Sequence, residues 1–232
     1  MGELSFAPHE FVESSGLHDL LAAYPRLRIQ TAKDGYLLVA GKLDFSAEKP
    51  GRVQITDSFE LLIKIPFGFP SSPPLVFEQG GRIPHNFHRL EGGALCLASP
   101  TRQRLALARN PNVSSFFRDF VIPYLYSFVL HEQHAALPFG ELAHGRRGLI
   151  DDFKSLFIVT SDDAAIRLVY LTSRPKRKAN RQLCPCGSRI RLSKCKLHHQ
   201  IVLKLRKNLG RRWFRSQHEI LGGGTIKQIP VE

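Results

Sequence analysis

The feature that most constrains this chain of 232 residues is a basic stretch near its C-terminus, which also holds three of its four cysteines. Residues 174–216 contain fifteen Lys or Arg and no Asp or Glu, whereas the rest of the chain has eighteen basic and twenty acidic residues. The net charge of +13 therefore belongs to this stretch. So polar a segment lacks a core of its own, which favours stabilisation by a bound metal ion.

The length suits one domain of about 150 residues plus an appendage, and 43% hydrophobic residues are enough for a buried core. We predict one domain over residues 1–173 and a second, basic region over 174–232. The sequence shows neither a signal peptide nor an apolar run of roughly 20 residues that could span a bilayer. We therefore expect a cytoplasmic protein, in which clustered cysteines bind metal rather than form disulfides.

The residue pattern predicts an α+β domain whose strands form an antiparallel meander. A block with four prolines, residues 65–74, forbids regular strand pairing and predicts a rigid connector. The expected elements, in chain order, are a helix at 8–23, strands at 36–45, 53–65 and 75–77, a long helix at 113–134 with a kink at Pro123, a helix at 148–157 and another from Ser161.

Cys96 is the one cysteine outside the C-terminal cluster, and it follows small residues in an irregular stretch. Because His85, Asn86 and His88 precede it closely, it is a candidate nucleophile. The neighbouring His85, His88 or Arg89 could raise the population of its thiolate, the reactive form of cysteine. The alternative is a buried and inert thiol, since free cysteine is among the most buried residue types.

Two sequence blocks in this order resemble the ubiquitin-conjugating enzymes. The stretch FPSSPPLVF at 69–77 resembles that family's YPxxPPxVxF, and GALCL at 93–97 resembles its GxICL. The resemblance covers about residues 10–135, and it is closer to divergent bacterial members from anti-phage operons of the CBASS type, some of which end in a zinc motif. The resemblance implies a ubiquitin-conjugating-like fold, with an N-terminal helix, a meander and C-terminal helices.

The resemblance also implies roles for Cys96 and its neighbours. Cys96 would hold a carrier protein's carboxyl terminus as a thioester and pass it to an amine. The family places His-Pro-Asn before the cysteine, and its asparagine stabilises the oxyanion; here the order is Pro84-His85-Asn86, and His88 stands at the usual spacing. Asn86 or His88 could take that role, or His85 and Asn86 could brace the loop by hydrogen bonds to its backbone.

A second polar group follows the long predicted helix, in FGELAHG at 139–145. This stretch resembles a signature of the bacterial relatives. Glu141 could orient His144, and His144 could deprotonate an incoming amine, because histidine titrates near neutral pH. Alternatively, both side chains satisfy local backbone groups at a turn.

The three clustered cysteines have the spacing of a metal site. Cys184 and Cys186 flank Pro185, eight residues separate Cys186 from Cys195, and His198 and His199 follow shortly after Cys195. The pattern resembles the SEC-C motif at the C-terminus of the SecA ATPase, which binds zinc. Lys196 stands at the usual fourth position, so we expect His198 to be the fourth ligand, with His199 as second choice. Four protein ligands predict a structural Zn²⁺ site with no open position.

Two basic clusters surround the metal motif, and aromatic residues lie among the second. The pattern is typical of a docking surface, for an acidic protein surface in preference to nucleic acid, or of a solvated tail whose apolar residues pack on the zinc knuckle. The second cluster falls on a predicted helix and is followed by Trp213 and Phe214.

Three functional hypotheses follow. The first is a ubiquitin-conjugating-like acyl transferase in bacterial antiviral defence, whose partner is a carrier with a reactive C-terminus, such as a bacterial cGAS-like nucleotidyltransferase. The second is a catalytically inactive scaffold of the same fold. The third is a zinc-dependent nucleic-acid-binding protein. The sequence has no glycine-rich ATP-binding motif, so activation of the carrier must come from elsewhere.

Overall fold

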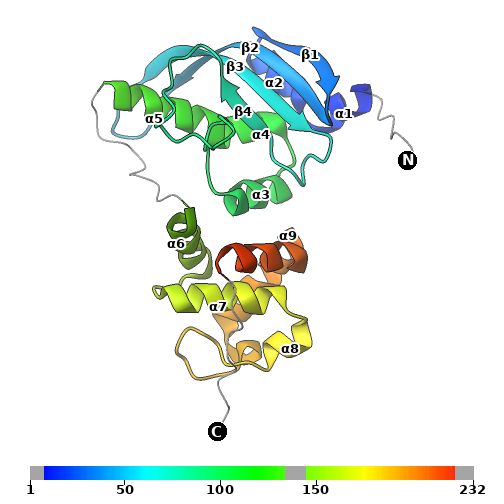
Figure 1. Ribbon diagram of the computed structural model, residues 1–232, viewed down its shortest axis with the longest axis vertical. Helices are drawn as coiled ribbons and strands as arrows, with labels where there is room; N and C mark the ends of the chain where they lie inside the picture. Colours follow the sequence, from blue (N-terminus) through cyan, green and yellow to red (C-terminus); the bar gives the residue numbers. More distant parts are fainter. Residues whose placement is uncertain (1–7, 134–144, 223–232) are drawn as a thin grey trace. The chain divides into compact units, whose positions relative to one another are not determined.

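The computed structural model describes residues 8–133 and 145–222, and the chain forms two compact units, Met1–Glu141 and Leu142–Glu232. Within the described residues, the first unit combines helices with an antiparallel sheet and the second is mainly helical (Figure 1). The predicted α+β class is therefore confirmed. The sequence placed the domain boundary at 173/174, whereas the two units meet about thirty residues earlier along the chain.

The sheet has four antiparallel strands in the order in which they occur along the chain. Alternate residues of the third strand, from Phe59 through Leu61 to Ile63, are buried, which is the period expected of a strand with one face on a core. The strands are β1 (Leu27–Lys33), β2 (Tyr36–Ala47), β3 (Ile55–Pro66) and β4 (Leu75–Glu78). The predicted meander is thus present, with β1 as an additional strand.

The predicted single helix at 8–23 is wrong, because the chain forms α1 (Pro8–Ser14) and α2 (Leu17–Ala23) with a break at Gly16. Gly16 has φ of 71°, a left-handed conformation that interrupts a helix. A β-carbon there would lie 2.1 Å from the Nδ2 atom of Asn112. The break is therefore also the place where a distant segment docks, and Val113 N–H donates to the Ser15 carbonyl over 2.8 Å.

The long predicted helix is present but irregular. It consists of α4 (Val113–Phe116), a π-helical turn η1 (Phe117–Val121) and α5 (Ile122–Glu132). The irregular turn immediately precedes Pro123, whose ring cannot donate a backbone hydrogen bond and clashes with the preceding turn. Leu125 and Phe128 of α5 join the strands in one core, and α5 lies along the sheet in Figure 1. A helix that the sequence did not predict, α3 (Pro100–Arg109), precedes this group and is capped by Ser99.

The second unit is built around a pair of packed helices, α7 (Asp162–Ser173) and α9 (Lys196–Ile220). Arg206 of α9 donates to the carbonyls of Leu171 and Thr172 at 2.6 and 2.9 Å and of Arg174 at 2.9 Å, at the C-terminal end of α7. Such contacts explain why the boundary lies before 174. The elements are α6 (Gly145–Phe157), α7 (Asp162–Ser173), α8 (Lys176–Asn180), a 3₁₀ turn η2 (Leu192–Lys194) and α9 (Lys196–Ile220), which bends at Gly210.

None of the helices in the described ranges is long and apolar enough to cross a membrane.

Candidate functional sites

Cys96 lies on a short hairpin-like loop that follows β4. Its N–H donates to the His88 carbonyl over 2.7 Å, and Leu95 N–H donates to the Val76 carbonyl of β4 over 2.7 Å. Arg89 and Leu95 form an antiparallel bridge, and the turn between these two arms contains Gly93 with φ of 81°. The loop is therefore anchored by backbone hydrogen bonds both to the sheet and within itself.

The anchoring depends on a buried ion pair that the sequence did not reveal. Arg89 Nη2 lies 3.0 Å from Glu78 Oε2, and the exposed fractions of the two side chains are 9% and 1%. The same guanidinium donates to the carbonyls of Ile83 at 2.6 Å and Gly93 at 3.3 Å. Because Arg89 ties the end of β4 to both sides of the loop, it fixes the path of the chain towards Cys96.

Tyr124 of α5 closes the other side of this loop. Its hydroxyl donates to the carbonyls of Phe87 at 3.0 Å and His88 at 3.2 Å. Burial raises the pKa of this phenol; the nearby Arg89 lowers it, whereas Cys96 and Glu78 raise it further. Tyr124 is thus close enough to interact electrostatically with the Cys96 thiol. From the sequence it was expected only to lie in the long predicted helix at 113–134.

The Cys96 thiol is half-buried, and burial raises its pKa. This direction is opposite to the expectation that His85, His88 or Arg89 increases the thiolate population of Cys96, and the Arg89 guanidinium is paired with Glu78. At neutral pH the thiol holds its proton, so a reaction at this sulfur needs a base to accept it.

The residues proposed to assist Cys96 differ in their placement. His88 is half-buried, its carbonyl accepts from Cys96 N–H, and its φ of 39° is uncommon for a residue with a side chain. Asn86 and His85 are exposed in the turn before it. Among the described residues, neither side chain makes a hydrogen bond, so the predicted bracing of the loop is not seen. Glu141 and His144 lie outside the described residues.

The second site is a cluster of three cysteines and one histidine. The ligand atoms of Cys184, Cys186, Cys195 and His198 lie within 4.8 Å of one another. The sulfurs of Cys186 and Cys195 are 4.0 Å apart, and Cys195 Sγ lies 3.3 Å from His198 Nδ1. A tetrahedron with Zn–S bonds of about 2.3 Å has sulfurs about 3.8 Å apart, so the cluster could hold a metal ion and is compatible with zinc.

The local fold of the cluster follows from its sequence. Cys184 N–H donates to the Ile190 carbonyl over 2.8 Å, and Gly187 takes φ of 82° in the turn between them. Cys195 then occupies the N-cap of α9, where the helix dipole favours a negatively charged thiolate. Three of the ligands thus come from one turn and one helix start.

His198 is oriented by a partner from another helix. Its Nε2 lies 3.0 Å from the carbonyl of Phe157, the last residue of α6, and the imidazole is 3% exposed. The carbonyl can only accept, so Nε2 carries the proton and the Nδ1 lone pair faces the cysteines. The sequence preference for His198 over His199 agrees with the cluster, which does not include His199, and Lys196 is exposed.

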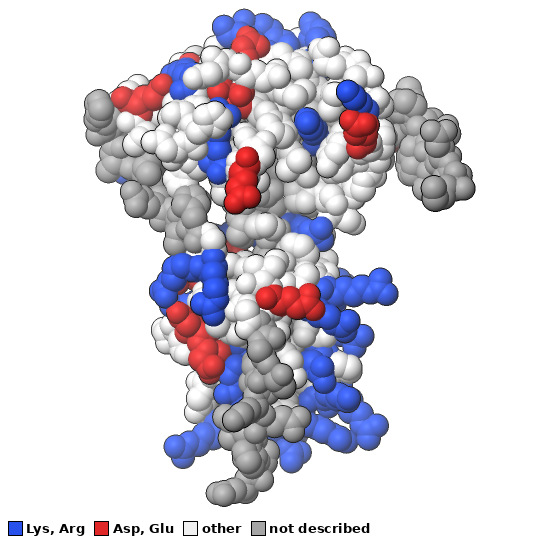
Figure 2. All heavy atoms as spheres, viewed as in Figure 1, with Lys and Arg blue, Asp and Glu red and all other residues white. Residues whose placement is uncertain are grey.

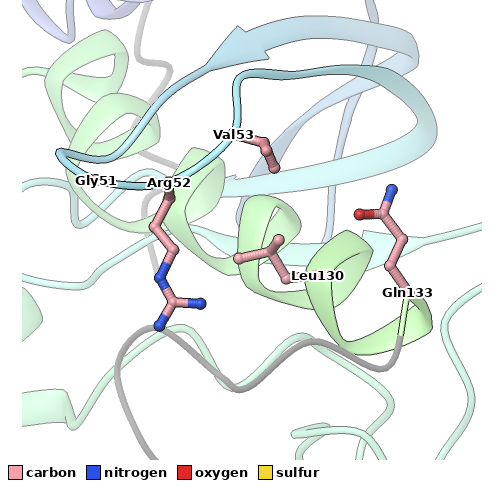
Figure 3. Close-up of a pocket in the computed structure, with 5 residues that line it drawn as sticks. All are labelled: Gly51, Arg52, Val53, Leu130 and Gln133. Carbon is pink, nitrogen blue, oxygen red and sulfur yellow. The ribbon is translucent and has the colours of Figure 1, made fainter.

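A separate surface pocket has a volume of about 460 Å³. It lies between the loop joining β2 to β3 and the end of α5, and Figure 3 shows its lining, which consists of Gly51, Arg52, Val53, Leu130 and Gln133. None of the residues predicted to be functional lines it, so we assign it no role.

We compared the chain with protein-family models, with curated proteins and with solved structures, and found no match in any of the three.

Proposed function

We propose that the chain is a ubiquitin-conjugating-like cysteine transferase, which holds the carboxyl terminus of a carrier protein as a thioester at Cys96. The observation that carries the proposal is the anchored loop after β4, which presents a half-buried, unpaired thiol beside His88 and Tyr124. The order of helices, four-stranded meander, cysteine loop and further helices also supports it. Within this proposal the fold is of the ubiquitin-conjugating type.

The chemistry requires an activated carrier. The Cys96 thiol gives up its proton, its sulfur forms a bond to the carbonyl carbon of an activated carboxyl terminus, and the leaving group departs with the electron pair of the broken bond. An amine of the target then attacks the thioester, and Cys96 is released as a thiol. Because burial raises the pKa of Cys96, the first step needs a base, and we assign that role to His88, whose carbonyl accepts from Cys96 N–H over 2.7 Å.

The metal cluster has a structural part in this proposal. Cys184, Cys186, Cys195 and His198 would hold Zn²⁺ with all four tetrahedral positions filled, which leaves no position for a substrate. The ion would stabilise the second unit and take no part in acyl transfer. We further propose that the system is bacterial antiviral defence of the CBASS type, with a bacterial cGAS-like nucleotidyltransferase as carrier.

The test is to trap the acyl intermediate. The wild type, Cys96→Ser and Cys96→Ala are expressed in bacteria with a candidate operon that encodes a cGAS-like nucleotidyltransferase, and adducts are quenched in acid and mapped by mass spectrometry. We expect a reductant-labile adduct at Cys96 in the wild type, a reductant-stable ester in Cys96→Ser and neither in Cys96→Ala. A Cys184→Ser variant, which retains Cys96, controls for adducts at other thiols.

Two outcomes contradict the proposal. If no reductant-labile adduct forms and Cys96→Ala protects cells against phage as well as the wild type does, the transferase function is wrong. Protection that survives loss of Cys96 would instead favour a catalytically inactive scaffold.

A further inference from the structure

The two units differ sharply in charge. Residues 1–144 contain thirteen Lys or Arg and fourteen Asp or Glu, a net charge of −1. Residues 145–222 contain nineteen Lys or Arg and five Asp or Glu, a net charge of +14. Figure 2 shows Lys and Arg side chains spread over the surface of this second unit. The excess is large enough to determine what the unit attracts.

Three of the five carboxylates described in the second unit, those of Asp151, Asp162 and Asp163, pair with bases that precede residue 174. Arg147 and Lys154 bind Asp162 at 2.9 and 3.0 Å, and Arg167 contacts Asp163 at 3.8 Å. Thirteen of the fifteen bases at 174–216 are exposed. In the described ranges none of the thirteen forms an ion pair. They are Lys176, Arg177, Lys178, Arg181, Arg189, Arg191, Lys194, Lys196, Lys204, Lys207, Arg211, Arg212 and Arg215.

The first half of α9 presents its bases on one side. Lys196 and Lys207 are eleven residues apart, which places them within about 20° of each other around the helix axis. Lys204 lies about 60° from Lys207 around the same axis. All three are exposed. The opposite side carries His198 and Val202, which are buried. The helix therefore directs positive charge to solvent along two to three turns while its other side holds the metal cluster and the core.

None of the aromatic side chains described in this unit is fully exposed, and Tyr170 and Trp213 are half-buried. Phe214 is fully buried, with its ring centroid 6.3 Å from that of Phe153, and Trp213 is half-buried. Among the described residues of the unit, the large exposed apolar side chains are all aliphatic: Ile158, Ile190, Leu197 and Ile220. Proteins that bind single strands rely on exposed aromatic platforms, whereas a duplex presents only its phosphates and its grooves.

We propose that the exposed bases of residues 176–215 form a surface that binds the phosphate backbone of double-stranded nucleic acid without sequence preference. The thirteen bases are six lysines and seven arginines, and both residue types donate hydrogen bonds to the phosphate oxygens of nucleic acids. This differs from the acidic protein partner that the sequence favoured. The inference is independent of acyl transfer at Cys96, so it can be tested in the Cys96→Ala protein.

The experiment measures binding of the full chain, loaded with zinc, to a fluorescent DNA duplex at several salt concentrations. The wild type is compared with Lys204→Glu/Lys207→Glu and with the matched control Lys33→Glu/Arg109→Glu, which changes the net charge equally at exposed positions of the first unit. We expect the α9 variant to weaken binding about tenfold or more and to reduce the slope of log K against log salt by about 2. The control should retain most of the affinity and the slope.

Three outcomes would overturn the proposal. Equal losses in the α9 and control variants would mean that net charge alone drives binding. Tighter binding to a single strand of the same length would contradict a duplex surface. Binding of polyglutamate in place of duplex would identify an acidic protein as the partner. If the reversed variant misfolds, as judged by circular dichroism and zinc content, the neutral variant Lys204→Gln/Lys207→Gln provides the same comparison with a smaller effect.

Discussion

The buried pair of Glu78 and Arg89 gives the sharpest test of how the Cys96 loop is held. In Arg89→Met the Glu78 carboxylate, whose side chain is 1% exposed, loses the one ion-pair partner that it has among residues 8–133 and 145–222. It would retain two long hydrogen bonds, from the N–H groups of Arg82 and Ile83, both at 3.3 Å. Breaking a buried ion pair from one side costs about 3–5 kcal/mol, and we expect that loss in the free energy of unfolding of the first unit.

Glu78→Gln should cost less, about 1–3 kcal/mol, because the Arg89 guanidinium keeps the carbonyls of Ile83 and Gly93 as acceptors. The double variant Glu78→Gln/Arg89→Met removes both charges, so its cost should fall below the sum of the single costs by about 1–3 kcal/mol. The sign of this difference separates a coupled pair from two independent residues.

Pulsed hydrogen exchange with mass spectrometry in urea is suited to the measurement, because it follows peptides of β3, β4 and the Cys96 loop separately from those of the second unit. The alkylation rate of Cys96 in native buffer is recorded in parallel and should rise in Arg89→Met, since the loop opens more often. A cost below about 1 kcal/mol for Arg89→Met, or additive single costs, would refute the assigned role of the pair.

Three further predictions concern other parts of the chain. Loss of a group that hydrogen-bonds to a metal ligand typically lowers metal affinity about 10–100-fold, and His198→Ala, which removes a ligand itself, should lower zinc affinity by more than this. His199→Ala should leave zinc affinity within about threefold. Competition with a chromogenic chelator measures both affinities. Because burial raises the pKa of Cys96, the rate of its alkylation should keep increasing above pH of about 8.5. The thiol's contribution to the free energy of unfolding should fall as pH rises through the same range. An alkylation rate that levels off below that pH would contradict the prediction. Arg206→Met should destabilise the second unit by about 2–3 kcal/mol, read from the fluorescence of its single tryptophan, while Lys207→Met should change it by less than about 0.5 kcal/mol.

The parts of the fold that could be predicted from sequence are those with a local pattern. The strand at 53–65 was predictable because the stretch is rich in β-branched, aromatic and leucine residues, and the prolines at 66–74 identified its end. The strand β1 was missed because Leu27 is its only buried residue. Its sequence therefore shows no alternation of hydrophobic and polar residues. The break at Gly16 was missed because one glycine inside an apolar period does not show that Asn112 packs against it.

The same distinction applies to the sites. The metal cluster was predictable because its four ligands lie within fifteen residues and their spacing alone brings them together. By contrast, the groups that hold the Cys96 loop come from distant positions, and several are backbone carbonyls, which leave no signature in a sequence. Tyr124 carried one available signal: it is a polar ring on an otherwise phenylalanine-rich helix face, and a buried phenol usually has a hydrogen-bond partner.

The hydrogen bond from His198 to the Phe157 carbonyl has a thermodynamic consequence for any metal bound at the cluster. The ligand set spans residues 184–198, but the group that fixes the histidine tautomer belongs to α6. A peptide that begins at residue 174 would lack the Phe157 carbonyl that orients the imidazole. It should therefore bind zinc about 10–100-fold more weakly than the whole unit, the loss typical of removing a hydrogen-bond partner of a metal ligand. By linkage, the metal in turn stabilises the end of α6, so metal affinity and helix packing form a single cooperative property.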